Sequence, residues 1–266
     1  MHVHFLDPYR PRPSLVHSLD ARVKFILTVA YILTCALTPL GAWPVFILLF
    51  SLVLAVEILS ELGVRYVLKR SILAAPFVLA ALPLIFTVPG STLVRLPLGS
   101  AALNVTVEGV ERLVSIAVKS WLSLQAAIIM SASMPFPDLL LAMRAVGMPR
   151  LLVAIIGLMW RYLFVLVDEA LRLMRARAAR SGFSDQEGLK SGGSLAWRAR
   201  VTGGMAGSLF LRGFERSDRI YTAMLSRGYD GEVRSMPLPA ITPSAWLTLL
   251  LGLLLLGLLL FLAFLL

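Results

Sequence analysis

The sequence predicts an all-α integral membrane protein with about five transmembrane helices and a layer of amphipathic helices on the cytoplasmic side. Of its 266 residues, 58% are hydrophobic and 15% are charged, whereas about a quarter of the residues of a soluble domain are charged. Four long runs contain no Asp, Glu, Lys or Arg, and they cover residues 25–56, 71–94, 120–137 and 235–266. The segment 135–243 differs, because arginines are interspersed among its apolar residues.

The uncharged runs predict the transmembrane helices. A helix needs about 20 mainly apolar residues to cross the hydrocarbon core of a bilayer. The first run is long enough for two helices, because Gly41-Ala42-Trp43-Pro44 supplies a turn in its middle. We therefore expect spans near 25–40, 43–60, 71–89, 112–133 and 244–266. Pro76 and Pro83 are expected to bend the third span, and the link at 90–108 is expected to form an outer turn or a small hairpin.

The chain is expected to divide into three parts. Residues 1–133 form the N-terminal arm and transmembrane helices 1–4, residues 134–243 form an amphipathic module on the cytoplasmic side, and residues 244–266 form the C-terminal transmembrane helix. The arm is polar and contains prolines, which argues against a cleaved signal peptide before the first span. Asp20 precedes that span and is expected to cap its helix.

The distribution of basic residues predicts the orientation in the membrane. Bases gather in the arm, in the link after span two and in the segment after span four, which holds fifteen Lys or Arg against nine Asp or Glu. The 41–44 turn has no charge, and the 90–108 link has one base, Arg95. Because positive loops stay cytoplasmic, we expect a multi-pass protein of the cell (inner) membrane with its N-terminus in the cytoplasm and its C-terminus outside. The net charge of +10 thus reflects topology, and no nucleic-acid partner is expected.

The first half of the amphipathic module predicts a short helix and then a long one. Prolines end the fourth span, a short helix follows at 139–146, and Gly147-Met148-Pro149 ends it. A helical pattern then covers 150–180. Its apolar positions form a stripe at Phe164, Val167, Leu171, Met174 and Ala178. The opposite half carries charge, at Glu169, Arg172 and Arg180. This pattern is typical of a helix at a membrane interface or on other helices.

A second long helix is predicted after a loop at 181–194. The helical pattern covers 195–227, and Gly228 is well placed as the glycine that ends it. The apolar residues form one narrow stripe, at Phe210, Phe214, Tyr221, Met224 and Leu225. The basic residues gather on the opposite side, at Arg212, Arg216, Arg219 and Arg227.

Residue patterns for enzyme chemistry are scarce. The sequence has no Gly-rich phosphate loop with Lys and Ser or Thr, so the chain is not expected to bind ATP itself, and no Cys or His spacing fits a zinc site. The three histidines lie within the first seventeen residues, where His2 and His4 are either a metal-binding pair or a chance pair. Glu57 and Lys119 are the remaining candidates for a membrane enzyme. Glu57 is instead expected in an ion pair near the interface, and Lys119 is expected to reach the headgroups or to pair with Glu111.

Two arginine motifs and several shorter segments resemble a known family. The motifs are Arg177-Ala178-Ala179-Arg180-Ser181-Gly182 and Met224-Leu225-Ser226-Arg227-Gly228-Tyr229-Asp230-Gly231. The shorter segments are Leu19-Asp20-Ala21-Arg22-Val23-Lys24, Pro135-Phe136-Pro137-Asp138-Leu139-Leu140, Gly147-Met148-Pro149-Arg150, Met159-Trp160-Arg161-Tyr162-Leu163-Phe164 and Asp168-Glu169. In this combination, which covers nearly the whole chain, the sequence resembles the T component of energy-coupling-factor ABC transporters (the EcfT/CbiQ family). It looks most like the cobalt-type CbiQ transmembrane subunit.

The resemblance implies that the two long amphipathic helices are coupling helices, each with a short Ala-Arg-Gly motif at its end. The arginines of these motifs are implied to dock into grooves of two cytoplasmic ABC ATPase subunits, which would carry ATP and Mg²⁺, while this chain binds no cofactor. The residues that match the motifs are Ala179, Arg180, Ser181, Ser226, Arg227 and Gly228. Ser181 stands where the family has Gly, and Ser226 stands where it has Ala. The supporting charges are Arg177, Arg216 and Arg219.

The implied function is the transmission of ATPase motion to a separate substrate-binding membrane (S) subunit of an importer. The cobalt-type branch implies cobalt or nickel ions held by that other subunit, while a vitamin-type substrate is an alternative because no residue here fixes the substrate. A self-contained permease or channel is the competing hypothesis, and a membrane enzyme that uses Glu57 and Lys119 is the third.

Overall fold

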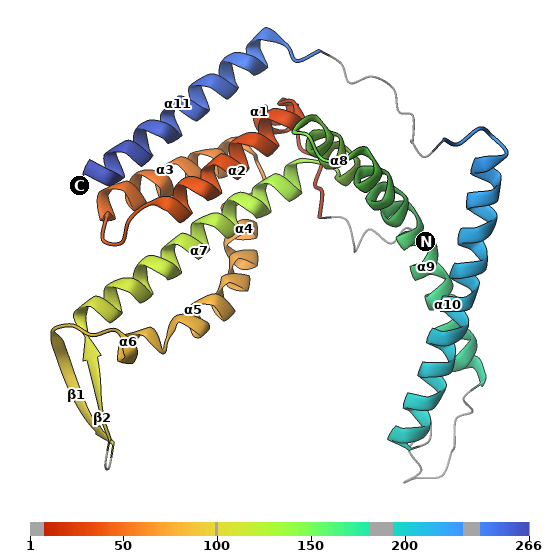
Figure 1. Cartoon of the computed structure of the whole chain (residues 1–266), viewed down its shortest axis with the longest axis horizontal. Coiled ribbons are helices and arrows are strands. Elements are labelled where there is room, and N and C mark those ends of the chain that lie inside the picture. Colours follow the sequence, from red (N-terminus) through yellow and green to blue (C-terminus); the bar gives the residue numbers. More distant parts are fainter. Residues whose placement is uncertain (1–7, 99–100, 181–193, 231–239, 266) are drawn as a thin grey trace. The chain divides into compact units, whose positions relative to one another are not determined.

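A computed structural model of the chain describes residues 8–98, 101–180, 194–230 and 240–265 (Figure 1). These residues fall into two compact units. One unit lies within Asp7–Val146 and Leu238–Leu266, and the other lies within Gly147–Pro237. We call the first the membrane unit and the second the hairpin unit, and each is described by itself.

The membrane unit consists of helices and one strand pair. Its helices are α1 (Leu15–Ser18), α2 (Ala21–Leu37), α3 (Trp43–Leu59), α4 (Val64–Ser71), the 3-10 helix η1 (Ile72–Ala74), α5 (Ala75–Ala81), α6 (Leu84–Thr87), α7 (Val107–Ser133), α8 (Phe136–Ala145) and α11 (Pro243–Leu265). Strands β1 (Thr92–Leu98) and β2 (Ala101–Thr106) pair antiparallel with Arg95 opposite Asn104, so the link takes the form of a hairpin. The hairpin unit contains α9 (Arg150–Arg180) and α10 (Leu195–Leu225).

The third predicted span is a broken helix. It runs from Val64 to Thr87 through α4, η1, α5 and α6, and it begins earlier than the predicted start at residue 71. The breaks fall next to Pro76, in the first turn of α5, and at Pro83, directly before α6. Proline has no N–H for the helical ladder and its ring clashes with the preceding turn, so the predicted bends are confirmed.

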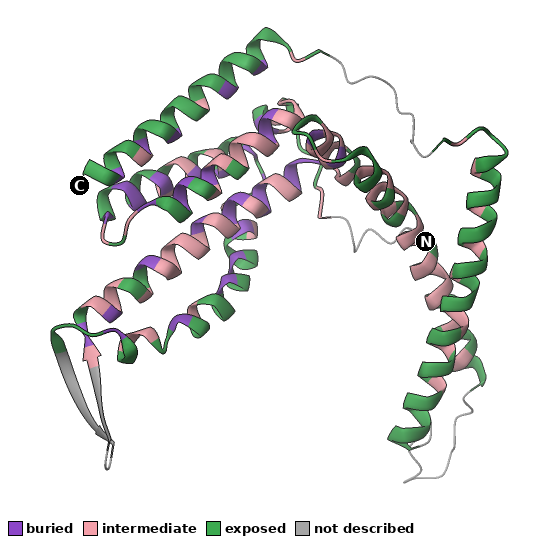
Figure 2. Ribbon diagram, in the orientation of Figure 1, coloured by how far each residue is buried: buried purple, intermediate pink, exposed green. Residues whose placement is uncertain are grey.

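Helices α2, α3, α7 and α11 build the core of the membrane unit. Cys35, Leu49 and Leu122 are fully buried in it, and Figure 2 shows buried residues along the facing sides of α2, α3 and α7. The hydroxyl of Tyr31 donates a hydrogen bond of 2.9 Å to the carbonyl of Leu49, which satisfies this buried polar group. Helix α11 packs so closely on α2 that a Cβ atom at Gly252 would come within 2.5 Å of a Leu27 methyl carbon.

The prediction that Glu57 forms an ion pair near the interface is wrong. Glu57 is 2% exposed, its Oε1 atom has no hydrogen-bond partner, and it makes no ion pair among the residues that the structure describes. The reason is the turn after α3, in which Glu61 adopts a φ of 53°. Because α4 starts anew at Val64, the bases that follow it in sequence do not continue the helical face that carries Glu57.

Lys119 has a structural partner that the sequence did not reveal. Its ammonium group donates hydrogen bonds to the carbonyls of Ala36, at 3.2 Å, and Thr38, at 2.5 Å. The last carbonyls of a helix lack partners within it and favour a nearby cation. Lys119 therefore ties α7 to the C-terminal end of α2, and the predicted pairing with Glu111 is wrong, while the predicted contact with headgroups stays a prediction.

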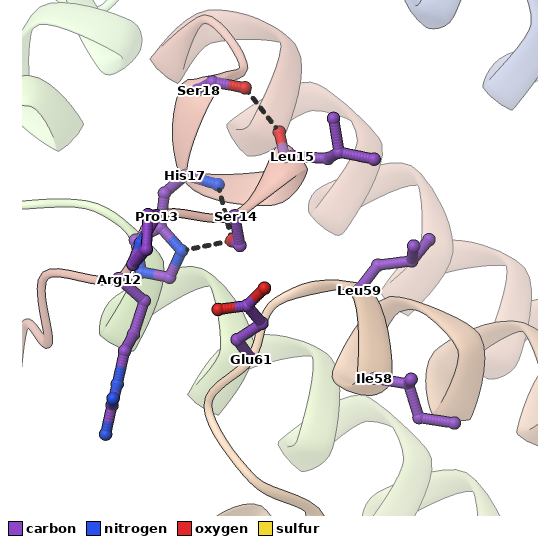
Figure 3. A pocket seen from close by; sticks show the side chains of 9 residues that line it. All are labelled: Arg12, Pro13, Ser14, Leu15, His17, Ser18, Ile58, Leu59 and Glu61. Atoms are coloured by element: carbon purple, nitrogen blue, oxygen red, sulfur yellow. Dashed lines mark hydrogen bonds between the residues drawn. The ribbon is translucent and has the colours of Figure 1, made fainter.

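The described part of the N-terminal arm packs against the membrane unit. Asp20 caps α2 as predicted, because its carboxylate accepts a hydrogen bond of 2.9 Å from the Arg22 N–H. A cavity between the arm and the end of α3 is lined in part by Ser14 and His17 (Figure 3). The two ring nitrogens of His17 are hydrogen-bonded to the Ser14 hydroxyl, at 2.6 Å, and to the Arg10 carbonyl, at 2.9 Å. This histidine thus holds the arm together.

Length and composition identify four candidate membrane spans in the described chain. They are Val64–Thr87, Val107–Ser133, Arg150–Arg180 and Pro243–Leu265. Helices α2 and α3 have 17 residues each, which extend about 26 Å at 1.5 Å per residue and approach the hydrocarbon thickness of about 30 Å. Helix α9 is therefore compatible with a span by length and composition, although its sequence pattern predicted a helix at the interface.

Candidate functional site

The two long helices of the hairpin unit run antiparallel. Near the end of α9, Arg177 donates a hydrogen bond of 3.0 Å to Thr202, near the start of α10. Further back, the Glu169 carboxylate lies 3.3 Å from the Arg212 guanidinium. Earlier still in α9, Leu158 lines a cavity together with Met224, near the end of α10. The end of α9 thus lies beside the start of α10, and an earlier part of α9 lies beside the end of α10, as Figure 1 also shows.

A few polar side chains of the two helices contact each other. Glu169 and Arg177 of α9 meet Arg212 and Thr202 of α10. The apolar stripes largely face away, and their most exposed members in α10 are Phe210, Phe214, Tyr221 and Leu225, which are 48% to 71% exposed. The most exposed members in α9 are Leu171 and Met174, at 39% and 59%. The helices therefore meet through charged groups at Glu169 and through apolar residues at the cavity, and exposed apolar residues also cover their outer sides.

A regular spacing explains how α10 fits against α9. Its half-buried positions recur every three or four residues, which marks one face of a helix. They are Val201, Met205, Ser208, Leu209, Gly213, Arg216, Ile220 and Met224. The contact is loose, because neither α9 nor α10 has a buried residue among those described. A cavity of about 360 Å³ remains between the helices where Leu158, Tyr162 and Ile220 line it.

The first predicted motif lies at the end of α9. Ala179 and Arg180 are the last two residues of that helix, and both are exposed. Ser181 lies outside the described residues. The Arg180 side chain therefore projects from the helix terminus into open surroundings, where it is accessible to another molecule.

The second predicted motif lies at the end of α10, where Gly228 closes the helix. Gly228 has a φ of 81°, and the N–H of Tyr229 donates a hydrogen bond of 3.0 Å to the Met224 carbonyl. This six-to-one bond with a left-handed glycine is a helix-terminating turn, so the predicted role of Gly228 is confirmed. The hydroxyl of Ser226 donates a hydrogen bond of 3.0 Å to the Ala223 carbonyl, and Arg227 is exposed.

The two motif arginines lie at opposite ends of the hairpin unit. Arg180 is close to Arg177, whose partner is Thr202 at the start of α10. Arg227 directly follows the other end of α10. From Thr202 to the end of α10 at Leu225 the helix extends about 35 Å, at 1.5 Å per residue. One chain thus presents two exposed guanidinium groups that are too far apart to bind the same small ligand.

The three supporting charges have different surroundings. The Arg177 guanidinium lies 5.9 Å from the ring centroid of Trp197, in addition to its bond with Thr202. Arg216 lies 3.8 Å from the Glu169 carboxylate, and Arg219 is exposed. The role of Glu169 as the partner of two arginines was not apparent from the sequence. The charge of Glu169 and the spacing of four between Arg212 and Arg216 are compatible with such a contact. The pattern of one helix, however, does not indicate which other helix packs against it.

Metal ligands do not gather in the described part of the chain. Among residues 8–98, 101–180, 194–230 and 240–265, no three His, Cys, Asp or Glu side chains are grouped so that they could hold an ion. The pair His2 and His4 lies outside the described residues.

Comparison with known proteins decides the family. A family model described as CbiQ, cobalt transport protein, matches residues 13–239. The chain belongs to the CbiQ family. The cobalt transport protein CbiQ of Salmonella typhimurium is 29% identical to it over 166 residues, which are 60% of this chain and 70% of that protein.

Relatives of this CbiQ-family chain also carry the name EcfT. The energy-coupling factor transporter transmembrane protein EcfT of Thermosediminibacter oceani is 26% identical over 239 residues, which are 85% of this chain and 84% of that protein. The protein with the same name from Heliobacterium modesticaldum is 26% identical over 251 residues, 88% of each chain. The resemblance to the EcfT/CbiQ family is thus confirmed, and the chain is a multi-pass transmembrane component of an energy-coupling-factor transporter.

Proposed function

We propose that this chain is the coupling subunit of an energy-coupling-factor importer, and that Arg180 and Arg227 dock into two cytoplasmic ATPase subunits. The observation that carries the proposal is the placement of two exposed arginines at opposite ends of one antiparallel helix pair. The large separation of Arg180 and Arg227 fits two separate binding grooves, one on each ATPase subunit. A guanidinium is a planar fork that can bind carboxylates or backbone carbonyls in two directions at once.

The proposal places the hairpin unit at the cytoplasmic face. Helix α10 is not among the candidate spans of the described chain, and it lies beside residues 158–177 of α9. Because that stretch of α9 packs beside α10, the two helices lie in the same environment. This favours a position of α9 at the membrane interface over a membrane crossing. Five crossings by the other helices then leave the N-terminus in the cytoplasm and the C-terminus outside, in agreement with the basic loops.

The outer apolar sides of α9 and α10 provide the contact with a substrate-binding membrane subunit. Phe210 and Phe214 are 71% and 60% exposed, and such side chains in water would be costly. ATP and Mg²⁺ bind to the ATPase subunits, and closure of these subunits moves the two arginine-bearing helix ends. The apolar sides pass this motion to the substrate-binding subunit, so this chain performs no catalysis.

The names of the relatives support a proposal for the substrate class. The name CbiQ supports cobalt ions, with nickel as a chemically similar substrate, held by the other membrane subunit. A vitamin-type substrate is the alternative, because the EcfT names state no ion. A self-contained permease would be favoured instead if the purified chain alone carried Co²⁺ into liposomes.

The docking role is tested by reversing the charge of the two arginines. Arg180→Glu and Arg227→Glu should each weaken capture of the ATPase subunits from detergent, and the double variant should abolish both capture and ATP-driven uptake. Arg200→Glu is the matched control, because Arg200 is also exposed on α10 but lies in neither motif. Undiminished assembly and uptake in the membrane-inserted double variant would show that the arginines do not dock.

A further inference from the structure

A cluster of charges lies between α9 and α10, away from both docking arginines. One oxygen of the Glu169 carboxylate lies 3.3 Å from the Arg212 guanidinium, and the other oxygen lies 3.8 Å from the Arg216 guanidinium. Arg212 and Arg216 are four residues apart and therefore share one face of α10. Glu169 thus contacts two successive turns of the opposite helix with its two oxygens.

The contact with Glu169 stands out against the loose packing around it. The Glu169 side chain is 21% exposed, and the two arginine side chains are 57% and 39% exposed. Ion pairs that are exposed to this degree contribute little to stability. The contact with Arg212 is also a hydrogen bond of 3.3 Å, which is directional, so the main effect of Glu169 is on the relative position of the helices.

The alternatives to Glu169 for fixing that position are few. Toward the Arg227 end, the helices leave a cavity of about 360 Å³ between Leu158, Tyr162 and Ile220. Toward the Arg180 end, Arg177 makes a hydrogen bond to Thr202 and approaches the ring of Trp197. The apolar residues on the contact face at this end, Val201 and Met205, are only half-buried. Without a specific contact, α10 can slide along α9 by one helical turn.

We propose that Glu169 is a positioning residue that sets the register of α10 on α9, and thereby the separation of Arg180 and Arg227. The inference rests on the docking role proposed above, because register matters to transport only if both helix ends engage partners. A shift by one turn moves α10 by about 5 Å. Such a shift changes the span between the two guanidiniums while leaving each of them exposed and chemically intact.

The charges around Glu169 predict what happens when it is changed. The cavity beside it is lined by Asp168, Glu169, Arg172, Arg212 and Arg216, among others. With Glu169 ionised, three guanidiniums face two carboxylates. Glu169→Arg replaces the carboxylate that contacts both Arg212 and Arg216 with a guanidinium at the same place, and this repulsion drives α10 away from its register. Exchanging the signs, with Glu169→Arg in the presence of Arg212→Glu and Arg216→Glu, restores opposite charges at the same positions.

Spin labels on the two helices test the register directly. Labels at Arg175→Cys and Thr222→Cys, both exposed positions outside the motifs, would lie about 25 Å apart along the helix axis. In the purified full chain, pulsed electron resonance should show one narrow distance distribution. Glu169→Arg should broaden it or shift it by about 5 Å, and the charge-exchanged variant should restore it. Asp168→Arg is the control, because Asp168 lines the same cavity without an ion pair in the described chain.

The outcomes separate the register from docking. An unchanged distance distribution in Glu169→Arg overturns the positioning role, whatever happens to transport. A shifted distribution that the charge exchange restores supports it, and ATP-driven uptake should then fall at least tenfold in Glu169→Arg and recover in the exchanged variant. The docking role is judged by a different measurement, the capture of ATPase subunits by Arg180→Glu and Arg227→Glu, which needs no spin label.

Discussion

Among single residues, Gly228 determines how the second arginine motif is presented. Its φ of 81° lies in the left-handed region, and the bond from the Tyr229 N–H to the Met224 carbonyl depends on that turn. Residues with a Cβ atom adopt this conformation at a cost of roughly 1–2 kcal/mol, and Asn tolerates it better than others. The turn that Gly228 completes therefore holds the backbone around Arg227 in place at the end of α10.

Replacement of Gly228 should weaken ATPase binding through the backbone alone. A Cβ atom there would meet no atom within 4 Å, so any effect of Gly228→Val comes from the positive φ. We expect the affinity of the purified chain for the ATPase subunits to fall about fivefold to thirtyfold, as a cost of roughly 1–2 kcal/mol implies. Gly228→Asn should retain most of the affinity. Equal binding by the Val and Asn variants would rule out this role of the turn.

Between elements, polar groups hold the helices together in both units. In the hairpin unit, Glu169 of α9 contacts Arg212 and Arg216 of α10, while most of the exposed apolar residues of α10 face outward. In the membrane unit, Lys119 of α7 closes the carbonyl end of α2. Within an apolar environment, unsatisfied carbonyls are costly, so a long basic side chain from a neighbouring helix is an effective partner for them.

Loss of this contact should destabilise the membrane unit. Lys119→Met keeps an unbranched side chain but removes the donor to Ala36 and Thr38, and we expect a loss of about 1–3 kcal/mol for hydrogen bonds to a charged group. Thermal unfolding in detergent should show a lower transition temperature for Lys119→Met than for the unaltered chain. Lys69→Met is the control because Lys69 is exposed at the end of α4. If Lys119→Met abolished uptake without lowering the unfolding temperature, the Lys119 side chain would act in transport and not in stability.

For the whole molecule, the central question is on which side of the membrane the hairpin unit lies. By length and composition α9 could cross the bilayer, whereas its pairing with the arginine-rich α10 favours the cytoplasmic face. A crossing by α9 would place Arg180 and the start of α10 on the outer side. Coupling to cytoplasmic ATPases would then be impossible through that arginine.

Chemical labelling distinguishes the two arrangements. A cysteine at the exposed position Arg200→Cys should react with a membrane-impermeant maleimide in inside-out vesicles and stay unlabelled in intact cells. The native Cys35 is buried in the core of the membrane unit, so its background reaction should be small and can be measured in the unaltered chain. Labelling of Arg200→Cys in intact cells would contradict the cytoplasmic placement and the docking proposal with it.

Local patterns in the sequence predicted the elements well. Uncharged runs located α2, α3, α7 and α11, and Pro76 and Pro83 located the breaks in the third span, because both signals act within a few residues along the chain. The termination of α10 at Gly228 was predictable for the same reason. The docking roles of Arg180 and Arg227 stay predictions from family resemblance, since the structure places these residues without showing what binds them.

Contacts between distant residues were harder to predict. Glu57 was expected to pair with nearby bases, but the turn at Glu61 directs the following helix elsewhere and leaves Glu57 buried. Lys119 meets carbonyls more than eighty residues away in sequence. Glu169 and its two arginines are separated by the segment between the helices. A helical wheel shows which residues share a face, but it does not show which face another helix will cover.

The antiparallel course of α9 and α10 makes the two attachment points of the chain unlike each other. Arg180 is the final residue of a helix, whereas Arg227 is held in a hydrogen-bonded turn that Gly228 completes. Even if the two ATPases were identical copies, this single chain would break their twofold symmetry. The two nucleotide sites would then act on different attachment points. Inactivation of one ATPase copy would therefore affect transport differently from inactivation of the other.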